Sequence, residues 1–444
     1  MTRSLSAAVA LAALAAACSP EHWSPPPVPP PPPIERIATQ PAGYTSPMAV
    51  AQVGGQAKLY VPTGTYHFAG PIAVLDLSVP GRGTRGAGAR VATIDVGGGE
   101  YATLVGGDAR VLVAASARFP TAWIIDPATD RVTRTIPLGD LGFSTYGARD
   151  AHVTGVIVDS GRNRAWLAVW NGFLAIDLTR GERVPAEDVA GAPSESPAYD
   201  PVRGLIYAPF YGCAGAHGPA GATPPPCAEF TTAGGAVMDA GMYVVRVSDR
   251  ARFTLRRPGA SEAAPLGLEP DAISIDVAAG LALVAEEAGG SELVLDLASA
   301  TFDATAGTVE LTAATAYAEI PGVAYACTAT LPATGDILLA AEFAPEVALA
   351  TSARLLAGQG PIIAEMPLLP LPGAVAWSTA GDPHGAAIVQ VGGKRYGLLL
   401  RDLHDWVARI DLDAVDALSP VSPSSLTAAE MAQVVDFLDT SAAP

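Results

Sequence analysis

The chain is poor in lysine, asparagine and positive charge. Lysine occurs only at positions 58 and 394, and asparagine only at 163 and 171. Acidic residues outnumber basic ones by 44 to 26, which gives a net charge of −18. A chain this acidic has no general attraction for nucleic acid or anionic lipid. Because half of its 444 residues are hydrophobic, it is not a disordered chain, and it is long enough to bury a large core.

Several catalytic and cofactor motifs are also missing. The four cysteines form no Cys-x-x-Cys, which excludes covalent haem, and no Gly-x-Ser-x-Gly nucleophile turn is present. The Gly-x-Gly-x-x-Gly pattern at 81–86 follows a predicted strand but leads into another strand, so no helix is available to hold a phosphate. We interpret it as a loop.

The N-terminus predicts export. Residues 1–17 combine Arg3 with an apolar stretch that is too short to span a bilayer, which is typical of a secretory signal. The segment Leu-Ala-Ala-Leu-Ala-Ala-Ala-Cys at 11–18 resembles a bacterial lipobox, although Ala15 stands where that motif usually has leucine. The resemblance implies lipidation of Cys18, and Ser19 after it implies the outer membrane of a two-membrane bacterium. The alternative is ordinary signal peptidase cleavage at an Ala-x-Ala site.

A proline-rich segment follows the predicted anchor. Eight of residues 25–33 are proline, which favours polyproline II and a stiff stalk about 30 Å long at about 3.1 Å per residue. We therefore predict that residues 18–33 are the lipid anchor and stalk of a folded domain. A ligand for a proline-binding module is the alternative.

Residues 123–139, Trp-Ile-Ile-Asp-Pro-Ala-Thr-Asp-Arg-Val-Thr-Arg-Thr-Ile-Pro-Leu-Gly, predict a β-hairpin. Two β-prone runs flank an Asp-Pro turn, and the second run alternates its faces. This stretch resembles the YVTN-type β-propeller repeat, carried here by Ile125, Asp126, Thr129, Val132 and the run 135–139.

A spacing of about 50 residues repeats along the chain. Equivalent turn positions are Asp76, Asp126, Asp177, Ser248, Asp296 and Asp411. The interval after Asp177 contains an insert, and the last interval covers two periods and hides a unit near Leu349. One such unit cannot bury both of its faces alone, so neighbours must cover it. We predict an all-β fold, a single seven-bladed β-propeller of four-stranded blades over residues 34–420, with a C-terminal helix and tail at 421–444.

Two details concern the ends of the ring. Residues 34–40 are placed to supply the outer strand of the last blade. Near the C-terminus, Thr427 and Glu430 form a capping-box pattern, and an apolar stripe follows at helical spacing, which predicts a short helix over 426–438.

Aligning the blades places acidic and histidine residues at one mouth of the central channel. Several carboxylates and two imidazoles there could hold a divalent metal, or could simply line a wet channel. The candidate metal ligands are Asp150, His152, Glu195, Asp271, Asp382 and His384, with Glu100 nearby. No cofactor is predicted beyond such a metal.

The other cysteines lie in or beside predicted strands. Cys213 and Cys227 flank a Gly/Pro-rich loop in the insert of the fourth blade, and in an exported protein this pair predicts a disulfide. Metal binding together with His217 is the alternative. The insert joins second and third strands, so we expect it to overhang the channel mouth. Cys327 is expected to be a buried strand residue.

These observations favour a binding scaffold for a protein or glycan partner, contacted at the channel-mouth face, over an enzyme. Metal-dependent lactonase propellers use channel asparagine, and both asparagines here lie in predicted turns. The alternative hypothesis is a metal-dependent hydrolase or oxidoreductase using the channel residues. A structural envelope component without a discrete site is a third interpretation.

Overall fold

The structure of the chain is a computed structural model. The described residues are 48–63, 70–79, 90–97, 102, 104–116, 119–139, 153–169, 172–191, 194, 196–210, 230–231, 237–238, 241–256, 270–286, 291–304, 307–311, 317–321, 325–331, 334–341, 346–367, 385–400, 406–418 and 425–440.

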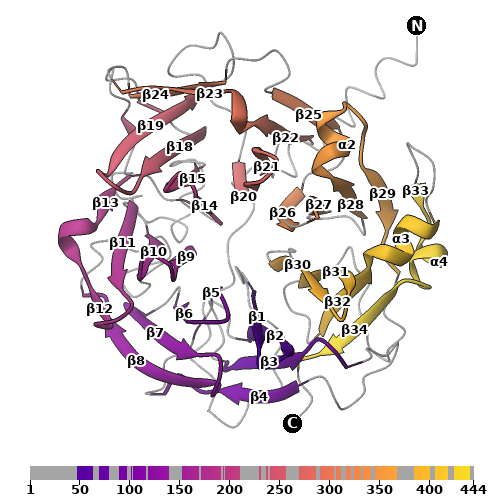
Figure 1. Cartoon of the computed structure of the whole chain (residues 1–444), viewed down its shortest axis with the longest axis horizontal. Coiled ribbons are helices and arrows are strands. Elements are labelled where there is room, and N and C mark those ends of the chain that lie inside the picture. Colours follow the sequence, from indigo (N-terminus) through magenta and orange to yellow (C-terminus); the bar gives the residue numbers. More distant parts are fainter. Residues whose placement is uncertain are drawn as a thin grey trace, which may run out of the picture.

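Seven antiparallel sheets stand around a central axis, so the predicted seven-bladed β-propeller is confirmed (Figure 1). In each blade the first strand lies nearest the axis and the fourth lies outside. The first three blades contain β1 (Ala49–Val53), β2 (Gln56–Pro62), β3 (Ile72–Asp76) and β4 (Arg90–Ile94); β5 (Leu104–Gly107), β6 (Leu112–Ala115), β7 (Thr121–Asp126) and β8 (Arg131–Pro137); and β9 (Gly155–Asp159), β10 (Arg164–Val169), β11 (Gly172–Asp177) and β12 (Glu182–Arg183), with β13 (Val189–Ala190) also on β11.

The other four blades follow in chain order. They contain β14 (Ala198–Asp200), β15 (Leu205–Phe210), β18 (Gly241–Arg246) and β19 (Ala251–Arg256); β20 (Pro270–Asp276), β21 (Leu281–Glu286), β22 (Ser291–Asp296) and β25 (Tyr317–Pro321); β26 (Tyr325–Leu331), β27 (Asp336–Ala341), β28 (Glu346–Thr351) and β29 (Ile362–Glu365); and β30 (Gly385–Val391), β31 (Lys394–Leu400), β32 (Trp406–Asp411) and β34 (Val435–Asp439). Leu349 lies in the third strand of blade 6, where the long sequence interval predicted a hidden unit. The small hairpin of β16 (Phe230–Thr231) and β17 (Val237–Met238) lies within the blade-4 insert, which joins second and third strands as predicted.

The antiparallel order puts two kinds of turn on one face of the ring. Turns from first to second strand and from third to fourth strand lie at the same end of each blade, because neighbouring strands run in opposite directions. We call this end the turn face. The repeated aspartates lie there and close the turns: Asp126 Oδ1 accepts from the Ala128 N–H at 2.9 Å, and Asp177 Oδ1 accepts from the Thr179 N–H at 3.0 Å. This local hydrogen bond is the physical reason for the sequence repeat.

Hydrophobic cores lie between blades instead of within them. The strands β6, β10 and β15 are almost continuously buried, because each sheet is covered on both faces by its neighbours. The outer strand β8 is mostly exposed. The core between blades 2 and 3, for example, joins Val113 and Ile124 to Leu167 and Ile176. A blade removed from the ring would therefore expose two apolar faces.

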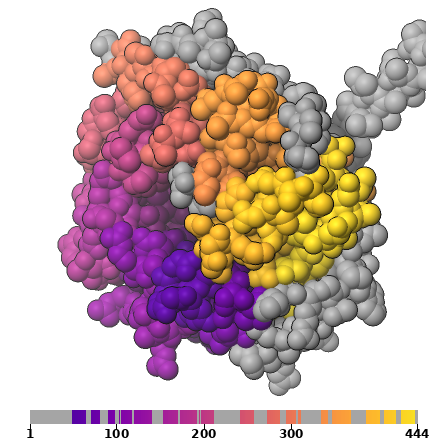
Figure 2. Space-filling model, turned by 45° about the vertical axis from the view of Figure 1, so that its right-hand side comes forward, coloured from indigo at the N-terminus to yellow at the C-terminus, as the bar shows by residue number. Residues whose placement is uncertain are grey.

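The two ends of the described chain form adjacent blades, and no strand passes between them (Figure 2). The fourth strand of blade 7 is β34, which pairs with β32 from Trp406↔Asp439 to Ile410↔Val435. The prediction that residues 34–40 supply this strand is wrong, and those residues lie outside the described part of the chain. Leu398, Leu400 and Val407 of blade 7 pack with Leu59 and Leu75 of blade 1 to close the ring.

The predicted C-terminal helix is present but shorter than expected. Helix α4 covers Ala428–Met431 and has the predicted capping box between Thr427 and Glu430. The chain then enters β34, so Val435 and Leu438 belong to a strand and not to a helical stripe. The apolar pattern over 434–438 fits both the helical and the strand period. The segment forms a strand because β32 offers it backbone hydrogen-bond partners. The propeller therefore extends beyond the predicted boundary at residue 420.

Two segments between third and fourth strands reach back to the preceding blade. In blade 5, β23 (Ala300–Asp303) and β24 (Thr308–Leu311) form a hairpin whose β24 pairs in parallel with β19 of blade 4. In blade 7, β33 (Ser425–Leu426) pairs in parallel with β29 of blade 6. Both additions cover edges that would otherwise be open. No helix among the described residues is long and apolar enough to cross a membrane.

Candidate functional site

The predicted channel ligands lie almost entirely outside the described residues. Only Asp271 belongs to a described element: its backbone is in β20, at a break in the register between Pro270 and Ala272. Within the described ranges, no three His, Cys, Asp or Glu side chains come together as a metal site. Cys18, Cys213 and Cys227 also lie outside, so their lipidation and disulfide stay predictions. Cys327 lies in the strand β26, which confirms its predicted place in a strand; its burial stays a prediction.

A pocket of about 710 Å³ lies on the turn face beside the first strands of blades 2, 3 and 4. We call it the mouth pocket. Its lining residues are Asp108, Arg110, Val156, Ile157, Val158, Asp159, Ser160, Gly161, Arg162, Pro197, Tyr199 and Pro201. The first strands converge near the axis of a propeller, so backbones approach closely there. A Cβ on Gly106 would lie 2.8 Å from the Val156 carbonyl oxygen, which explains why a residue without a side chain occupies that position.

The carboxylates of the mouth pocket are engaged in turns and in contacts between blades. Asp159 Oδ1 accepts from the Arg162 N–H at 2.9 Å, and its Oδ2 accepts from the Tyr199 hydroxyl of blade 4 at 2.7 Å. Asp108 accepts from the Arg110 N–H at 2.8 Å and from the Ser160 hydroxyl of blade 3. These bonds connect three successive blades: the turn after the first strand of blade 2, the turn after the first strand of blade 3, and Tyr199 in the first strand of blade 4.

The same bonds set the protonation of the pocket. Burial alone would raise the pKa of Asp159, but hydrogen bonds from Tyr199 and Arg162 outweigh it and hold the pKa below its ordinary value. For Asp108, burial is likewise outweighed by hydrogen bonds from Ser160 and from backbone N–H groups, so its pKa is also lowered. Burial and the bond to Asp159 raise the pKa of Tyr199. At neutral pH the pocket therefore has ionised carboxylates and a protonated tyrosine.

The guanidinium groups of the mouth pocket are more accessible than its carboxylates. The Arg110 side chain is 68% exposed and lies 3.4 Å from Asp108, and the Arg162 side chain is 46% exposed. Arg203, in the next first turn, is 41% exposed and 3.6 Å from the buried Asp200. The sequence does contain a signal for these turns. In blades 2, 3 and 4 an aspartate at or directly after the end of the first strand is followed two or three residues later by arginine. Sequence analysis missed it by considering only the opposite mouth.

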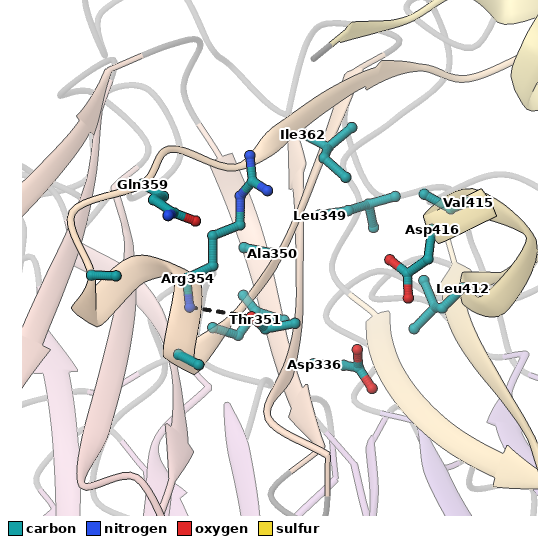
Figure 3. A pocket seen from close by; sticks show the side chains of 13 residues that line it. Asp336, Leu349, Ala350, Thr351, Arg354, Gln359, Ile362, Leu412, Val415 and Asp416 are labelled. Atoms are coloured by element: carbon teal, nitrogen blue, oxygen red, sulfur yellow. Dashed lines mark hydrogen bonds between the residues drawn. The ribbon is translucent and has the colours of Figure 1, made fainter. Parts of the chain in front are cut away.

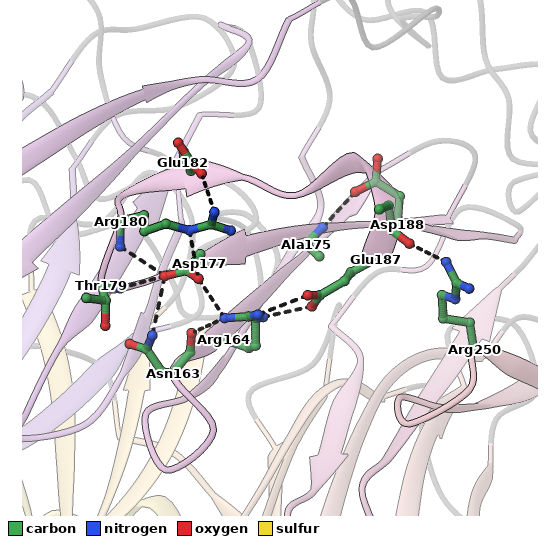
Figure 4. Close-up of polar contacts among 11 residues, drawn as sticks. Asn163, Arg164, Ala175, Asp177, Thr179, Arg180, Glu182, Glu187, Asp188 and Arg250 are labelled. Atoms are coloured by element: carbon green, nitrogen blue, oxygen red, sulfur yellow. Dashed lines mark hydrogen bonds and ion pairs between the residues drawn. The ribbon is translucent and has the colours of Figure 1, made fainter.

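A larger ion-pair network on blade 3 is satisfied internally (Figure 4). Arg164 donates to both Glu187 carboxylate oxygens at 2.7 and 2.9 Å and to Asp177 at 2.9 Å. Asp177 also lies 3.2 Å from Arg180. Arg250 of blade 4 donates to the Ala186 carbonyl, which links the two blades. These groups bind one another, so we interpret the network as structural.

Charge is divided unevenly along the chain and hence around the ring. Residues 1–257 have 21 Lys and Arg against 20 Asp and Glu, a net charge of +1, whereas residues 258–444 have 5 against 24, a net charge of −19. Blades 5 to 7 therefore contain the excess negative charge. The accessible arginines of the mouth pocket lie on the opposite, nearly neutral part of the ring.

Comparisons with known proteins show similarity only at the level of solved structures. No family model and no curated protein matches the chain. A structure titled Kuenenia stuttgartiensis Hydrazine Synthase has a TM-score of 0.45 and 15% identity and covers 68% of this chain and 82% of its own. A structure titled KlHsv2 with loop 6CD replaced by a Gly-Ser linker has a TM-score of 0.46 and 7% identity and covers 82% and 92%. At these values neither structure indicates a function for this chain.

Proposed function

We propose that this chain is an exported lipoprotein built on YVTN-like repeats, whose propeller is a rigid binding scaffold for an acidic glycan. Cys18 would be the lipid-modified residue, and the stalk at 18–33 would hold the ring away from the outer membrane. The observation that supports binding is the mouth pocket, which combines accessible guanidinium groups with carboxylates that are already engaged. An acidic protein segment is the other partner with suitable chemistry.

Contacts between blades support the rigidity of the scaffold. Side chains of one blade repeatedly donate to the turn of a neighbour, in addition to the apolar packing. Lys58 and Tyr60 of blade 1 each donate to Asp130 of blade 2 at 2.7 Å, and Ser352 of blade 6 donates to Asp276 of blade 5 at 2.6 Å. A preorganised surface loses little conformational entropy on binding.

The chemistry of the mouth pocket favours anionic oxygen atoms. Asp108 and Asp159 already accept several hydrogen bonds. Arg162 is also engaged, because its Nη1 donates to Asp159 at 2.7 Å and to the Pro201 carbonyl at 3.1 Å. The more exposed Arg110 is therefore the main donor for a partner. A guanidinium forms paired hydrogen bonds with a carboxylate. A volume of about 710 Å³ fits a saccharide unit in a concave site better than a flat protein surface. The uneven charge of the ring would also direct an anionic partner to blades 2 to 4.

The experiment compares binding of neutral oligosaccharides and uronic-acid oligosaccharides by the full chain, purified in detergent. Wild type should bind the acidic oligomers with an affinity that falls with salt. Arg110→Gln should weaken that binding about tenfold, close to the loss of one charged hydrogen bond. The matched control is Arg131→Gln, which removes an exposed arginine from the outer strand of the same blade. Equal binding of neutral and acidic oligomers, or no effect of Arg110→Gln, would contradict the proposal.

The anchor has its own test. Mass spectrometry of protein extracted from membranes should find a diacylglyceryl modification at Cys18, and Cys18→Ser should release the chain from the membrane. An unmodified N-terminus after cleavage would show ordinary secretion instead.

A further inference from the structure

Three arginines of the turn face occupy equivalent places on neighbouring blades. Arg110, Arg162 and Arg203 lie in the turns after the first strands of blades 2, 3 and 4. In each turn the backbone N–H of the arginine donates to Oδ1 of the aspartate that precedes it, at 2.8, 2.9 and 3.0 Å. We call these three side chains the arginine arc. Because the backbone contact is the same, the three side chains start from matching points around the ring.

The turn itself does not require arginine. Blade 5 makes the same turn with alanine, and Asp276 Oδ1 accepts there from the Ala278 and Ala279 N–H groups at 3.1 Å. The corresponding turns of blades 1 and 7 are Gly-Gly pairs, at 54–55 and 392–393. The arginine arc therefore adds positive side chains to a kind of turn that forms without them, and it stops at blade 4.

Contacts between blades join the three turns into one continuous surface. Arg110 Nη2 is 3.4 Å from Asp108, which also accepts from the Ser160 hydroxyl of blade 3. In the same turn as Ser160, Arg162 Nη1 donates to the Pro201 carbonyl of blade 4 at 3.1 Å, two residues before the arginine of that blade. Each arginine of the arc is thus linked to the next turn through a single intervening group.

In the arginine arc the positive groups lie outside their carboxylate partners. Side-chain exposure is 46% for Arg162 against 8% for Asp159, and 41% for Arg203 against 1% for Asp200. Arg110 is the most exposed, at 68% against 45% for its aspartate. Although each arginine is balanced by one aspartate, a partner that approaches from solvent meets the guanidinium groups first.

Another pocket of the ring, of about 450 Å³, has a different charge pattern (Figure 3). It lies between α2 (Ser352–Leu356) of blade 6 and α3 (Leu412–Leu418) of blade 7. Arg354 lines it, but Nη2 of this side chain is buried. Arg395 beside it is 20% exposed and pairs with three carboxylates, which belong to Asp336, Asp413 and Asp416. This pocket therefore does not favour a polyanion, in contrast to the arginine arc.

We propose that the arginine arc binds an acidic polysaccharide lengthwise across blades 2 to 4, with Arg110 at one end and Arg203 at the other. A partner with one anionic group satisfies one arginine, whereas a chain with a carboxylate on every sugar engages several at once and gains affinity by multivalency. Val202, beside Arg203, is 77% exposed and offers an apolar contact for the C–H face of a sugar ring.

This inference rests on the proposed function and deepens it. It makes the partner a chain and not a single acidic sugar, and it adds Arg203, which does not line the mouth pocket. Arg203 should therefore affect only partners that are long enough to extend from the mouth pocket to the turn of blade 4.

The experiment is isothermal titration calorimetry of the full chain with a dimer and a hexamer of the same uronic acid. Wild type should bind the hexamer more tightly. Arg203→Gln should weaken the hexamer about threefold to fivefold, as expected for one exposed ion pair, and leave the dimer unchanged. Arg203→Lys keeps the charge and should retain most of the affinity for the hexamer. Lys394→Gln is the matched control, because it removes an exposed positive charge beside the first turn of blade 7.

The ratio of the hexamer and dimer affinities decides the outcome. A longer chain also gains affinity by offering more binding positions, but that gain would be equal in wild type and in Arg203→Gln. An unchanged ratio in Arg203→Gln would therefore overturn the inference and leave the proposed function intact. If neither oligomer binds, the proposed function fails, and the inference fails with it. Tighter binding of linear polyphosphate than of the hexamer would also overturn the inference, since polyphosphate has no C–H face for Val202.

Discussion

A buried arginine adds hydrogen bonds to the apolar packing that closes the ring between blades 7 and 1. Among the described residues no strand of blade 7 pairs with a strand of blade 1, so the contacts across this seam are made by side chains. Arg409 of β32 is 5% exposed, and its Nη1 donates to the Leu77 carbonyl at 2.7 Å and to the Val79 carbonyl at 2.9 Å, across the seam. Its Nε donates to Asp436 Oδ1 at 2.9 Å, and the guanidinium lies 5.1 Å from the Tyr396 ring centroid.

Arg409→Met removes these bonds while keeping much of the aliphatic volume. Breaking a buried ion pair by removing one partner costs about 3–5 kcal/mol, because the other charge is left unpaired. Asp436 is 31% exposed, so water can reach it and reduce that part of the cost. The two carbonyls across the seam also lose a charged donor, at about 1.5–3 kcal/mol each if nothing replaces it. We expect a total destabilisation of at least about 3 kcal/mol.

The assay is urea unfolding combined with hydrogen exchange. Arg409→Met should lower the urea midpoint and speed exchange in β2, β3, β32 and β34, while β21 of blade 5 keeps its protection. The double variant Arg409→Met/Asp436→Asn should recover part of the loss, since it also removes the carboxylate charge that Arg409 balanced. The exposed Arg131→Met is the control and should change stability by less than about 0.5 kcal/mol. A loss below about 1 kcal/mol, or faster exchange spread evenly around the ring, would refute the view that Arg409 stabilises the seam.

Three further predictions follow from buried groups. The folded-state pKa values of Asp159 and Asp177 are lowered, so the unfolded chain takes up protons before the folded chain as pH falls. The melting temperature should therefore be constant near neutrality and drop below about pH 4. An unchanged melting temperature at about pH 3 would contradict this prediction. Ser352→Ala removes the buried donor to Asp276 and should cost about 1–3 kcal/mol in urea unfolding, with Ser352→Thr the milder comparison. Trp123→Ala empties a fully buried site and should cost about 3–5 kcal/mol; a value below about 1 kcal/mol would mean that the core between blades 1 and 2 collapses around it.

Much of the fold could be predicted because its units are local. Many hairpins are specified by an aspartate turn, such as Asp126 with Ala128, or by a Gly-Gly turn, such as Gly54-Gly55, and by strands of alternating or continuous apolar residues. That pattern repeats, so the blade count and even the unit around Leu349 followed from spacing. The exceptions are segments whose pattern fits two periods. Residues 435–439 satisfy helical spacing, yet the open edge of β32 offers them backbone partners, and they form β34.

The candidate sites were less predictable. The mouth pocket depends on Asp108, Ser160, Asp159 and Tyr199, which are up to about 90 residues apart in sequence and meet only because first strands converge on the axis. The metal ligands predicted for the opposite mouth lie outside the described residues, apart from the backbone of Asp271.

The sequence by itself determined the blades: their strands, their turns and their number. These features rest on backbone preferences and on hydrogen bonds within about 50 residues, and the local order of residue types predicts such contacts. The tertiary structure alone decided which segment completes the last blade, how the ring closes through Arg409, and which charged groups share a pocket. Those outcomes depend on distances between residues of different blades. Such distances are fixed only once the blades have packed against one another through their apolar faces.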